Sequence, residues 1–184
     1  MKKIFVMLML AVSTGVFAAD YVAISVESVT NLKNNSESTA QFVRAGKEIN
    51  GIQYAMLSRT ARNNNGTGLF NSIEGTVGKN YSVQGITVTP YVGIAHDNTR
   101  NGAGQPFYYG VAGVTAGTKV GPGHALLGAK TRALTTAEVE TTQRLVFAQY
   151  AYPVAKDVSL FVGTSYSMGD IRERAFGGGI GFRF

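Results

Sequence analysis

The 184-residue sequence contains no cysteine and only two histidines, His96 and His124, which lie far apart in the chain. A disulfide framework and a thiolate metal site are therefore excluded, and no histidine cluster with metal-ligand spacing is present. Charged residues make up only 15% of the chain, and its 17 lysines and arginines are scattered rather than gathered in one stretch. We therefore expect no metal or other cofactor, and no nucleic-acid partner.

The sequence also lacks an apolar run long enough to cross a bilayer as a helix, which requires about 20 residues. Its most apolar stretch, residues 4–12, follows Lys2 and Lys3 and precedes small residues that end at Ala18. A short apolar run between a basic start and a small-residue site is the pattern of a secretory signal peptide. We expect residues 1–18 to be this signal peptide and residues 19–184 to form one exported domain.

Glycine, with 23 residues, and aromatic side chains, with nine tyrosines and ten phenylalanines, are abundant instead. Much of the chain alternates apolar with small or polar residues, which is the period of a strand with one apolar face. The clearest case is the alternation of Ile86, Val88, Val92 and Ile94 with Thr87, Thr89, Tyr91 and Gly93. In a membrane barrel, the first set would face lipid and the second the lumen. Pro90 lies within this segment and has no N–H to donate, so we expect a β-bulge there.

The alternating segments number about ten, with lengths close to the roughly 9 to 11 residues that a tilted membrane strand needs. Longer polar connections are expected at residues 31–39, 63–68, 96–105, 135–140 and 168–173. Shorter turns between them centre on Glu48, Asn80, Gly121 and Ala155. This alternation is typical of barrels with short periplasmic turns and longer outer loops. Residues 40–45 are the weakest strand; if they formed a loop, eight strands would replace the favoured ten, because the count has to be even.

The end of the chain carries a second pattern, in which aromatic and apolar residues share one face of a strand and glycines occupy the other. The ending from Gly179 to Phe184 resembles the terminal signal of bacterial outer-membrane β-barrels, a glycine followed by alternating aromatic residues that close the chain. Together with the signal peptide, it makes the chain similar to small Gram-negative outer-membrane β-barrel proteins of the porin-like or opacity-like kind.

The resemblance implies an all-β, antiparallel, up-and-down transmembrane β-barrel in the outer membrane. It also implies an assembly signal at Gly179, Phe182 and Phe184 that the barrel-assembly machinery reads during biogenesis. The remaining partners it implies are outer-membrane lipids and lipopolysaccharide. Tyrosines near strand ends or on outward faces would supply the interfacial girdles of such a barrel. The candidates are Tyr21, Tyr54, Tyr108, Tyr109, Tyr150, Tyr152 and Tyr166.

Single charged residues occupy the polar face of several expected strands and therefore point into the lumen. They are Glu27, Arg59, Glu74, Lys130, Arg132 and Arg183. Because desolvated charges have to be paired, we expect ion pairs that largely plug a narrow barrel. The alternative is a charged constriction in a narrow, passive, porin-like channel for small solutes.

A third possibility is a barrel enzyme that acts on lipid or protein. His96 and Asp97 stand together at the start of an expected outer loop, where barrel enzymes keep a catalytic histidine beside an aspartate or serine. A surface histidine beside an aspartate is more often simply solvated. We therefore expect a non-enzymatic barrel with a structural or surface-interaction role and a largely plugged lumen.

Overall fold

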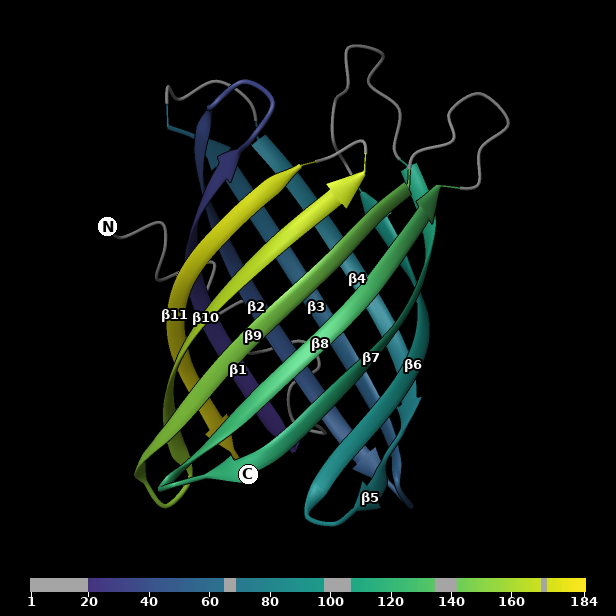
Figure 1. Ribbon diagram of the computed structural model, residues 1–184, viewed down its shortest axis with the longest axis vertical. Coiled ribbons are helices and arrows are strands. Elements are labelled where there is room, and N and C mark those ends of the chain that lie inside the picture. The colour runs from purple at the N-terminus through teal and green to yellow at the C-terminus, as the bar shows by residue number, and fades with distance from the viewer. Residues whose placement is uncertain (1–19, 65–68, 98–106, 135–141, 170–171) are drawn as a thin grey trace.

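The computed structural model describes residues 20–64, 69–97, 107–134, 142–169 and 172–184 (Figure 1). The expected signal peptide, residues 1–18, lies outside these ranges. Within them, no helix is long and apolar enough to cross a membrane. The strands are β1 (Tyr21–Asn31), β2 (Glu37–Ile49), β3 (Ile52–Asn63), β4 (Leu69–Lys79), β5 (Tyr81–Val83), β6 (Ile86–Asp97), β7 (Phe107–Val120), β8 (Gly123–Leu134), β9 (Thr142–Ala155), β10 (Val158–Gly169) and β11 (Glu173–Arg183).

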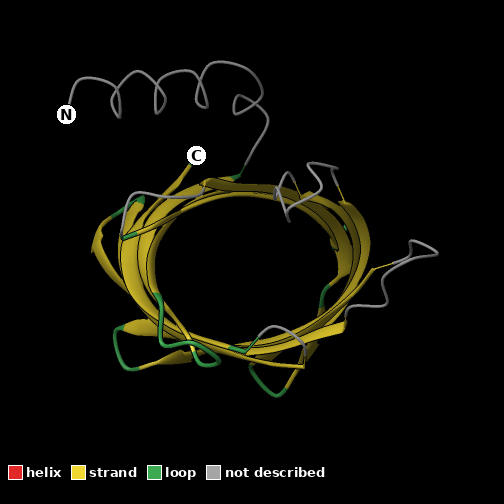
Figure 2. Cartoon of the chain, turned by 90° about the horizontal axis from the view of Figure 1, so that it is seen from above, coloured by secondary structure: helices red, strands yellow, loops and turns green. Residues whose placement is uncertain are grey.

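The strands form one antiparallel sheet that closes on itself. Neighbours in sequence are neighbours in the sheet, and β1 pairs with β11 along its whole length, from Tyr21↔Arg183 to Asn31↔Glu173. Figure 2 shows the resulting barrel end-on. Closure leaves no edge strand with unpaired N–H and C=O groups, which is the condition for a sheet to cross a membrane. The expected all-β, up-and-down antiparallel barrel is confirmed.

The barrel has ten strands, because β4 and β5 are two parts of one interrupted strand. β4 pairs with β6 as far as Gly78↔Tyr91, and β5 resumes at Tyr81↔Val88 in the same register. The gap lies opposite Pro90, which has no N–H to contribute to a ladder. The bulge expected at Pro90 is therefore wrong: pairing is interrupted there without any extra residue.

The register shift that does occur lies in the hairpin between β9 and β10. Ala155 pairs with Val158 and Pro153 with Ser159, which leaves Val154 as an extra residue on β9. A bulge beside a proline is a common way to accommodate it within a sheet. β9 consequently runs through Pro153, which the sequence had placed in a turn, and the turn contains only residues 156–157.

The connections differ between the two ends of the barrel. At the end that holds the C-terminus, the turn end, they have two residues each; at the other end, the loop end, they have three to nine (Figure 1). Asn50 and Gly51 both have positive φ, as does the Gln84–Gly85 pair, which identifies two-residue turns of the kind that follows strand twist. The turn expected around Asn80 is therefore displaced to residues 84–85.

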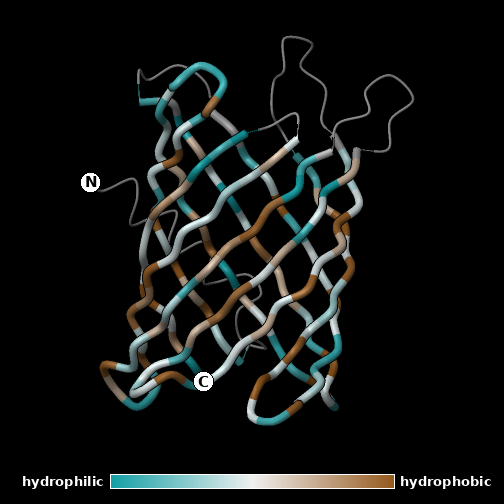
Figure 3. The backbone as a smooth tube through the Cα atoms, viewed as in Figure 1, coloured by the Kyte–Doolittle hydropathy of each residue, from teal (hydrophilic) through white to brown (hydrophobic). Residues whose placement is uncertain are grey.

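Side chains alternate between lumen and exterior along the strands. On β6, Thr89 and Ala95 are 5% and 2% exposed inside the barrel, whereas Val92 and Ile94 are 59% and 74% exposed on its outer surface. Apolar residues recur on many of the strands (Figure 3). A continuous exposed apolar surface of this extent is unfavourable in water, and hydrocarbon is the medium that accommodates it.

The tyrosines expected in interfacial girdles divide into exposed and inward-facing ones. Tyr54 and Tyr152 are exposed near the turn end, and Tyr108 and Tyr166 near the loop end. Tyr109, by contrast, is buried inside the barrel. Tyr21 also faces inward, where it lines an internal cavity. Tyr150 donates its hydroxyl to the Val120 carbonyl at 3.1 Å.

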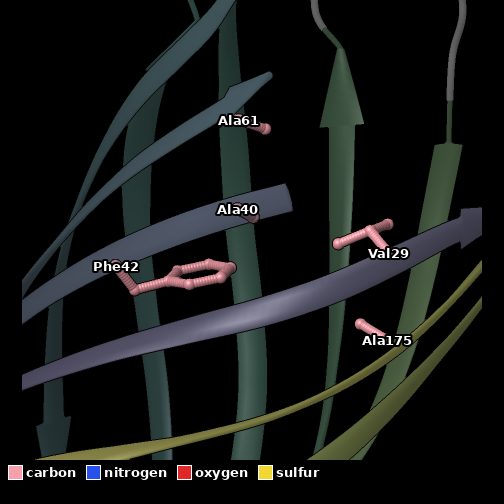
Figure 4. Packing of buried hydrophobic residues seen from close by; sticks show 5 residues of the cluster. All are labelled: Val29, Ala40, Phe42, Ala61 and Ala175. Atoms are coloured by element: carbon pink, nitrogen blue, oxygen red, sulfur yellow. The ribbon is translucent and has the colours of Figure 1, made fainter. Parts of the chain in front are cut away.

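β2 was expected to be the weakest strand, yet it spans 13 residues. At its loop end the usual pattern is reversed, with the apolar Ala40 and Phe42 buried inside and the polar Gln41 exposed outside. Phe42 and Ala40 pack with Val29, Ala61 and Ala175 from neighbouring strands (Figure 4). The strand was underestimated because its apolar side faces the lumen rather than lipid.

Candidate functional site

The lumen is packed tightly at its loop end. Nearly every strand has a buried inward-facing residue within four positions of that end, with relative exposures of 0% for Ala40 and Ser167 and 2% for Ala95. Most of these side chains are small, so the strands themselves and the few larger inward groups fill the space. At the turn end, inward residues such as Gln53 and Ala151 are only partly buried. The lumen is therefore packed more tightly at one end than at the other.

A buried ion cluster adjoins the packed end. Lys130 Nζ on β8 donates to both carboxylate oxygens of Glu74 on β4, at 2.9 and 3.0 Å. Arg132 Nη2, also on β8, donates to Glu74 Oε2 at 2.7 Å. β6 and β7 separate these two strands in the sheet, so the contacts cross the lumen rather than a strand pair. The three side chains are only 6% to 13% exposed.

Two further groups hold Arg132 in place. Its Nη1 lies 3.5 Å from Gln143 Oε1, and its guanidinium lies over the Tyr109 ring, 5.3 Å from the centroid. Planar stacking on an aromatic face and a fixed fork of donors are properties that lysine does not share. We call Glu74, Lys130, Arg132, Gln143 and Tyr109 the Glu74 cluster.

A second cluster is more exposed. Arg44 Nη2 on β2 lies 3.5 Å from Glu27 Oε1 on β1, and Arg44 Nη1 donates to Gln149 Oε1 on β9 at 3.0 Å. β1, β11 and β10 separate β2 from β9, so this contact also crosses the lumen. The side chains of Arg44 and Glu27 are 32% and 18% exposed. We call Glu27, Arg44 and Gln149 the Arg44 cluster.

A third ion pair joins β3 to β11, where Arg59 Nη2 lies 3.6 Å from Glu173 Oε2. The guanidinium groups of Arg59 and Arg44 both lie over the Phe42 ring, 5.7 and 5.6 Å from its centroid. Phe42 therefore connects the Arg44 cluster to this pair through two cation–π contacts.

A cavity of about 300 Å³ remains between these groups, with residues from every strand in its wall except the short β5. Five of the charges expected in the lumen line it: Glu27, Arg59, Glu74, Lys130 and Arg132. Part of the wall over β8–β10 is apolar, with Leu126, Leu145, Phe147 and Phe161. Arg183, the sixth expected charge, is instead exposed at the turn end of β11.

The sequence did not single out Arg44 or Glu173. Arg44 shares a strand face with Ala40 and Phe42, and this apolar face did not resemble a lumen face. Glu173 was assigned to a loop, although it has the same parity as Ala175 and Gly177 in the strand that follows. Extending the alternation of β11 by one residue pair toward the loop would have identified it.

The strand directs the side chains of His96 and Asp97 away from each other. They are consecutive residues of β6, so their side chains point to opposite faces of the wall. The His96 ring contacts Tyr108 on β7, with the ring centroids 4.6 Å apart. In the described ranges, no group of three or more histidine, aspartate or glutamate side chains is placed to hold a metal ion.

The expected assembly signal lies on β11 and just beyond it. A Cβ added at Gly179 would collide with the Ile24 carbonyl on β1 and the Phe161 ring, so the close approach of these groups requires glycine. Phe182 lies on the outer face of the strand, and Phe184 is 80% exposed. The role of these residues in assembly stays a prediction.

No protein-family model and no curated protein sequence matches the chain. Among solved structures, it is similar to the β domain of the Bordetella autotransporter BrkA, with 11% identity, a TM-score of 0.54 and coverage of 91% of this chain and 100% of that one. For a bacterial polysaccharide outer-membrane secretin, the identity is 9%, the TM-score is 0.52, and the coverage is 90% of this chain and 65% of that one. For Neisserial surface protein A, the identity is 15%, the TM-score is 0.44, and the coverage is 89% of this chain and 96% of that one.

At these identities the likeness concerns the fold alone. The closed sheet and its apolar outer face define a transmembrane β-barrel. Within that class, the chain has the fold of bacterial outer-membrane β-barrels, with ten strands.

Proposed function

We propose that this protein is a non-enzymatic, non-conducting outer-membrane barrel with a structural or surface-interaction role. The lipid-facing wall anchors it, and its loop end faces the cell exterior. The observation that carries the proposal is the Glu74 cluster, in which one carboxylate on β4 binds two cations on β8 across the lumen.

The burial of this cluster supports a plug rather than a filter. Charges that select permeating ions have to face water, whereas Glu74 and Lys130 are 6% and 8% exposed. Paired and dry, they block the lumen at the level where small residues such as Ala40 and Ala95 already bring the walls close together. Desolvating such charges is tolerated because each has a partner.

A narrow channel for small solutes is the second candidate. The cavity of about 300 Å³, which nearly every strand lines, supports it. The Arg44 cluster would then be its charged constriction, because its side chains retain access to solvent. This second candidate function requires a path along which small solutes can pass the Glu74 cluster.

Osmotic swelling of vesicles that contain the refolded protein tests the choice. We expect no uptake of a pentose through the wild type. Replacing Glu74, Lys130 and Arg132 together with glycine should start uptake, whereas the matched Glu27→Gly/Arg44→Gly variant should stay closed. Heat-modifiable electrophoretic mobility verifies folding of each variant. Pentose uptake by the wild type would overturn the proposal.

A further inference from the structure

Exposed arginines also occur on the outer surface near the loop end. Arg144 on β9 directly follows Gln143, which is buried inside the barrel, and Arg174 on β11 directly precedes the buried Ala175. Because consecutive residues of a strand point to opposite faces, both arginines point outward. This is the side of the wall that elsewhere carries apolar residues.

The sheet register brings the two arginines close together. Arg144 pairs with Met168 of β10, and Arg174 pairs with Tyr166 of the same strand. They therefore flank β10, roughly 10 Å apart at the spacing of adjacent strands. Leu32 N donates to the Arg172 carbonyl at 2.8 Å, which places the exposed Lys33 and Arg172 at the loop end near Arg174. We call Lys33, Arg144, Arg172 and Arg174 the outer basic patch.

Within the described ranges, no ion pair or side-chain hydrogen bond engages these four side chains. Glu173, which stands between Arg172 and Arg174 in the sequence, points inward and pairs with Arg59. Exposed Arg62 on β3 offers a contrast. It pairs with Thr39, and Glu37 lies two residues further along the same face of β2. Arg62 therefore has this carboxylate one strand away, whereas Arg174 has it two strands away, because Thr30 of β1 pairs with both Arg174 and Glu37.

The wall between the patch and the turn end is apolar. Val162 and Leu160 on β10 are 54% and 50% exposed, and Phe176 on β11 is 66% exposed. Tyr166 and Met168, between the two arginines, are amphipathic or flexible side chains of the kind found where hydrocarbon meets head groups. A molecule that fits this surface has long acyl chains and several negative charges at one end.

We propose that the outer basic patch binds the two phosphates of a lipid A-type glycolipid in the outer leaflet, whose acyl chains lie over β9–β11. Guanidinium groups bind phosphate oxygens in a bidentate manner, and two arginines on either side of one strand match a head group with two separate phosphates. In the orientation of the proposed function, on which this inference rests, the loop end faces the leaflet in which such a lipid resides. The inference holds whether or not the lumen conducts.

Mass spectrometry of the intact protein in detergent, titrated with defined lipids, tests this site. The probes are bisphosphorylated hexa-acyl lipid A, its monophosphoryl form and phosphatidylglycerol. We expect the bisphosphorylated lipid to bind most tightly. The Arg144→Gln/Arg174→Gln variant should lower its affinity about tenfold or more, since two charge-assisted contacts are lost. The matched Arg62→Gln variant should bind like the wild type.

Circular dichroism and heat-modifiable mobility verify that both variants fold, which their exposed positions favour. Equal weakening by Arg62→Gln would show attraction to net charge alone and overturn the site. Equal affinity for phosphatidylglycerol would overturn the assignment to a two-phosphate lipid. Absence of lipid A binding by the wild type would overturn the proposal as a whole.

Discussion

The Glu74 cluster and the Arg44 cluster use the same chemistry at different levels of burial. Each contains a carboxylate–arginine pair and a contact across the lumen, yet the Glu74 side chain is 6% exposed and the Glu27 side chain 18%. Glu74 binds two cations at 2.7 to 3.0 Å, whereas Arg44 lies 3.5 Å from its only carboxylate partner. The difference indicates that the Glu74 cluster is shielded from solvent, whereas the Arg44 cluster is partly accessible to it.

The largest expected effect follows from removing the central carboxylate of the buried cluster. Glu74→Ala leaves Lys130 and Arg132 without their carboxylate in a dry environment. Breaking a buried pair in this way costs about 3 to 5 kcal/mol. Urea titration of the protein folded into vesicles measures this loss. A loss below about 1 kcal/mol, the range of solvent-screened pairs, would mean that the cluster is hydrated.

Arginine substitutions on the two faces of one strand compare the cavity in the lumen with the lipid-facing surface. Val114 and Thr115 are neighbours on β7; Val114 is 41% exposed outside, and Thr115 lines the cavity. Val114→Arg should cost about 2 to 4 kcal/mol because it places a charge in hydrocarbon. Thr115→Arg should cost less, since the cavity has room and polar partners. Folding yields in vesicles that rank the two variants in the opposite order would contradict the assignment of faces.

Enlarging a side chain tests the packing of the loop end. Ala40 is fully buried there, so Ala40→Leu should destabilise the barrel by about 1 to 3 kcal/mol through overpacking. Ala55 lines the cavity, and Ala55→Leu has space to occupy. Thermal shifts of heat-modifiable mobility report both. Equal destabilisation would show that the two regions are packed alike.

The smallest effect is expected in the exposed cluster. Glu27→Ala removes the carboxylate partner of Arg44, whose side chain is 32% exposed and keeps its hydrogen bond to Gln149. Partly screened pairs of this kind contribute about 0 to 1 kcal/mol. In the same urea titration, a loss as large as that of Glu74→Ala would remove the distinction between the clusters.

The sequence predicted the fold because alternation along a closed barrel is nearly uniform. It also identified the lumen face of Glu74, Lys130 and Arg132, whose strands carry apolar residues on the opposite side. It failed where that contrast is absent or reversed, as on β2, whose inward face carries Phe42 beside Arg44. It also missed the turn at Gln84, because glutamine rarely adopts positive φ.

Which charges meet could not be predicted from alternation. Parity assigns a residue to the lumen, whereas the contact of Glu74 with β8 depends on strand tilt and on the register of every pair between them. The outer basic patch could not be predicted from alternation for the same reason. Arg144 and Arg174 are distant in sequence, and only their shared pairing with β10 makes them neighbours.

Ion current through the wild-type protein in planar lipid bilayers tests the central claim most directly, namely that the Glu74 cluster closes the lumen. We expect no steady current, and we expect a current to appear once Glu74, Lys130 and Arg132 are replaced together by glycine. A steady wild-type current whose ion selectivity is reversed by Lys130→Glu would contradict the claim and identify these residues as the filter of a channel.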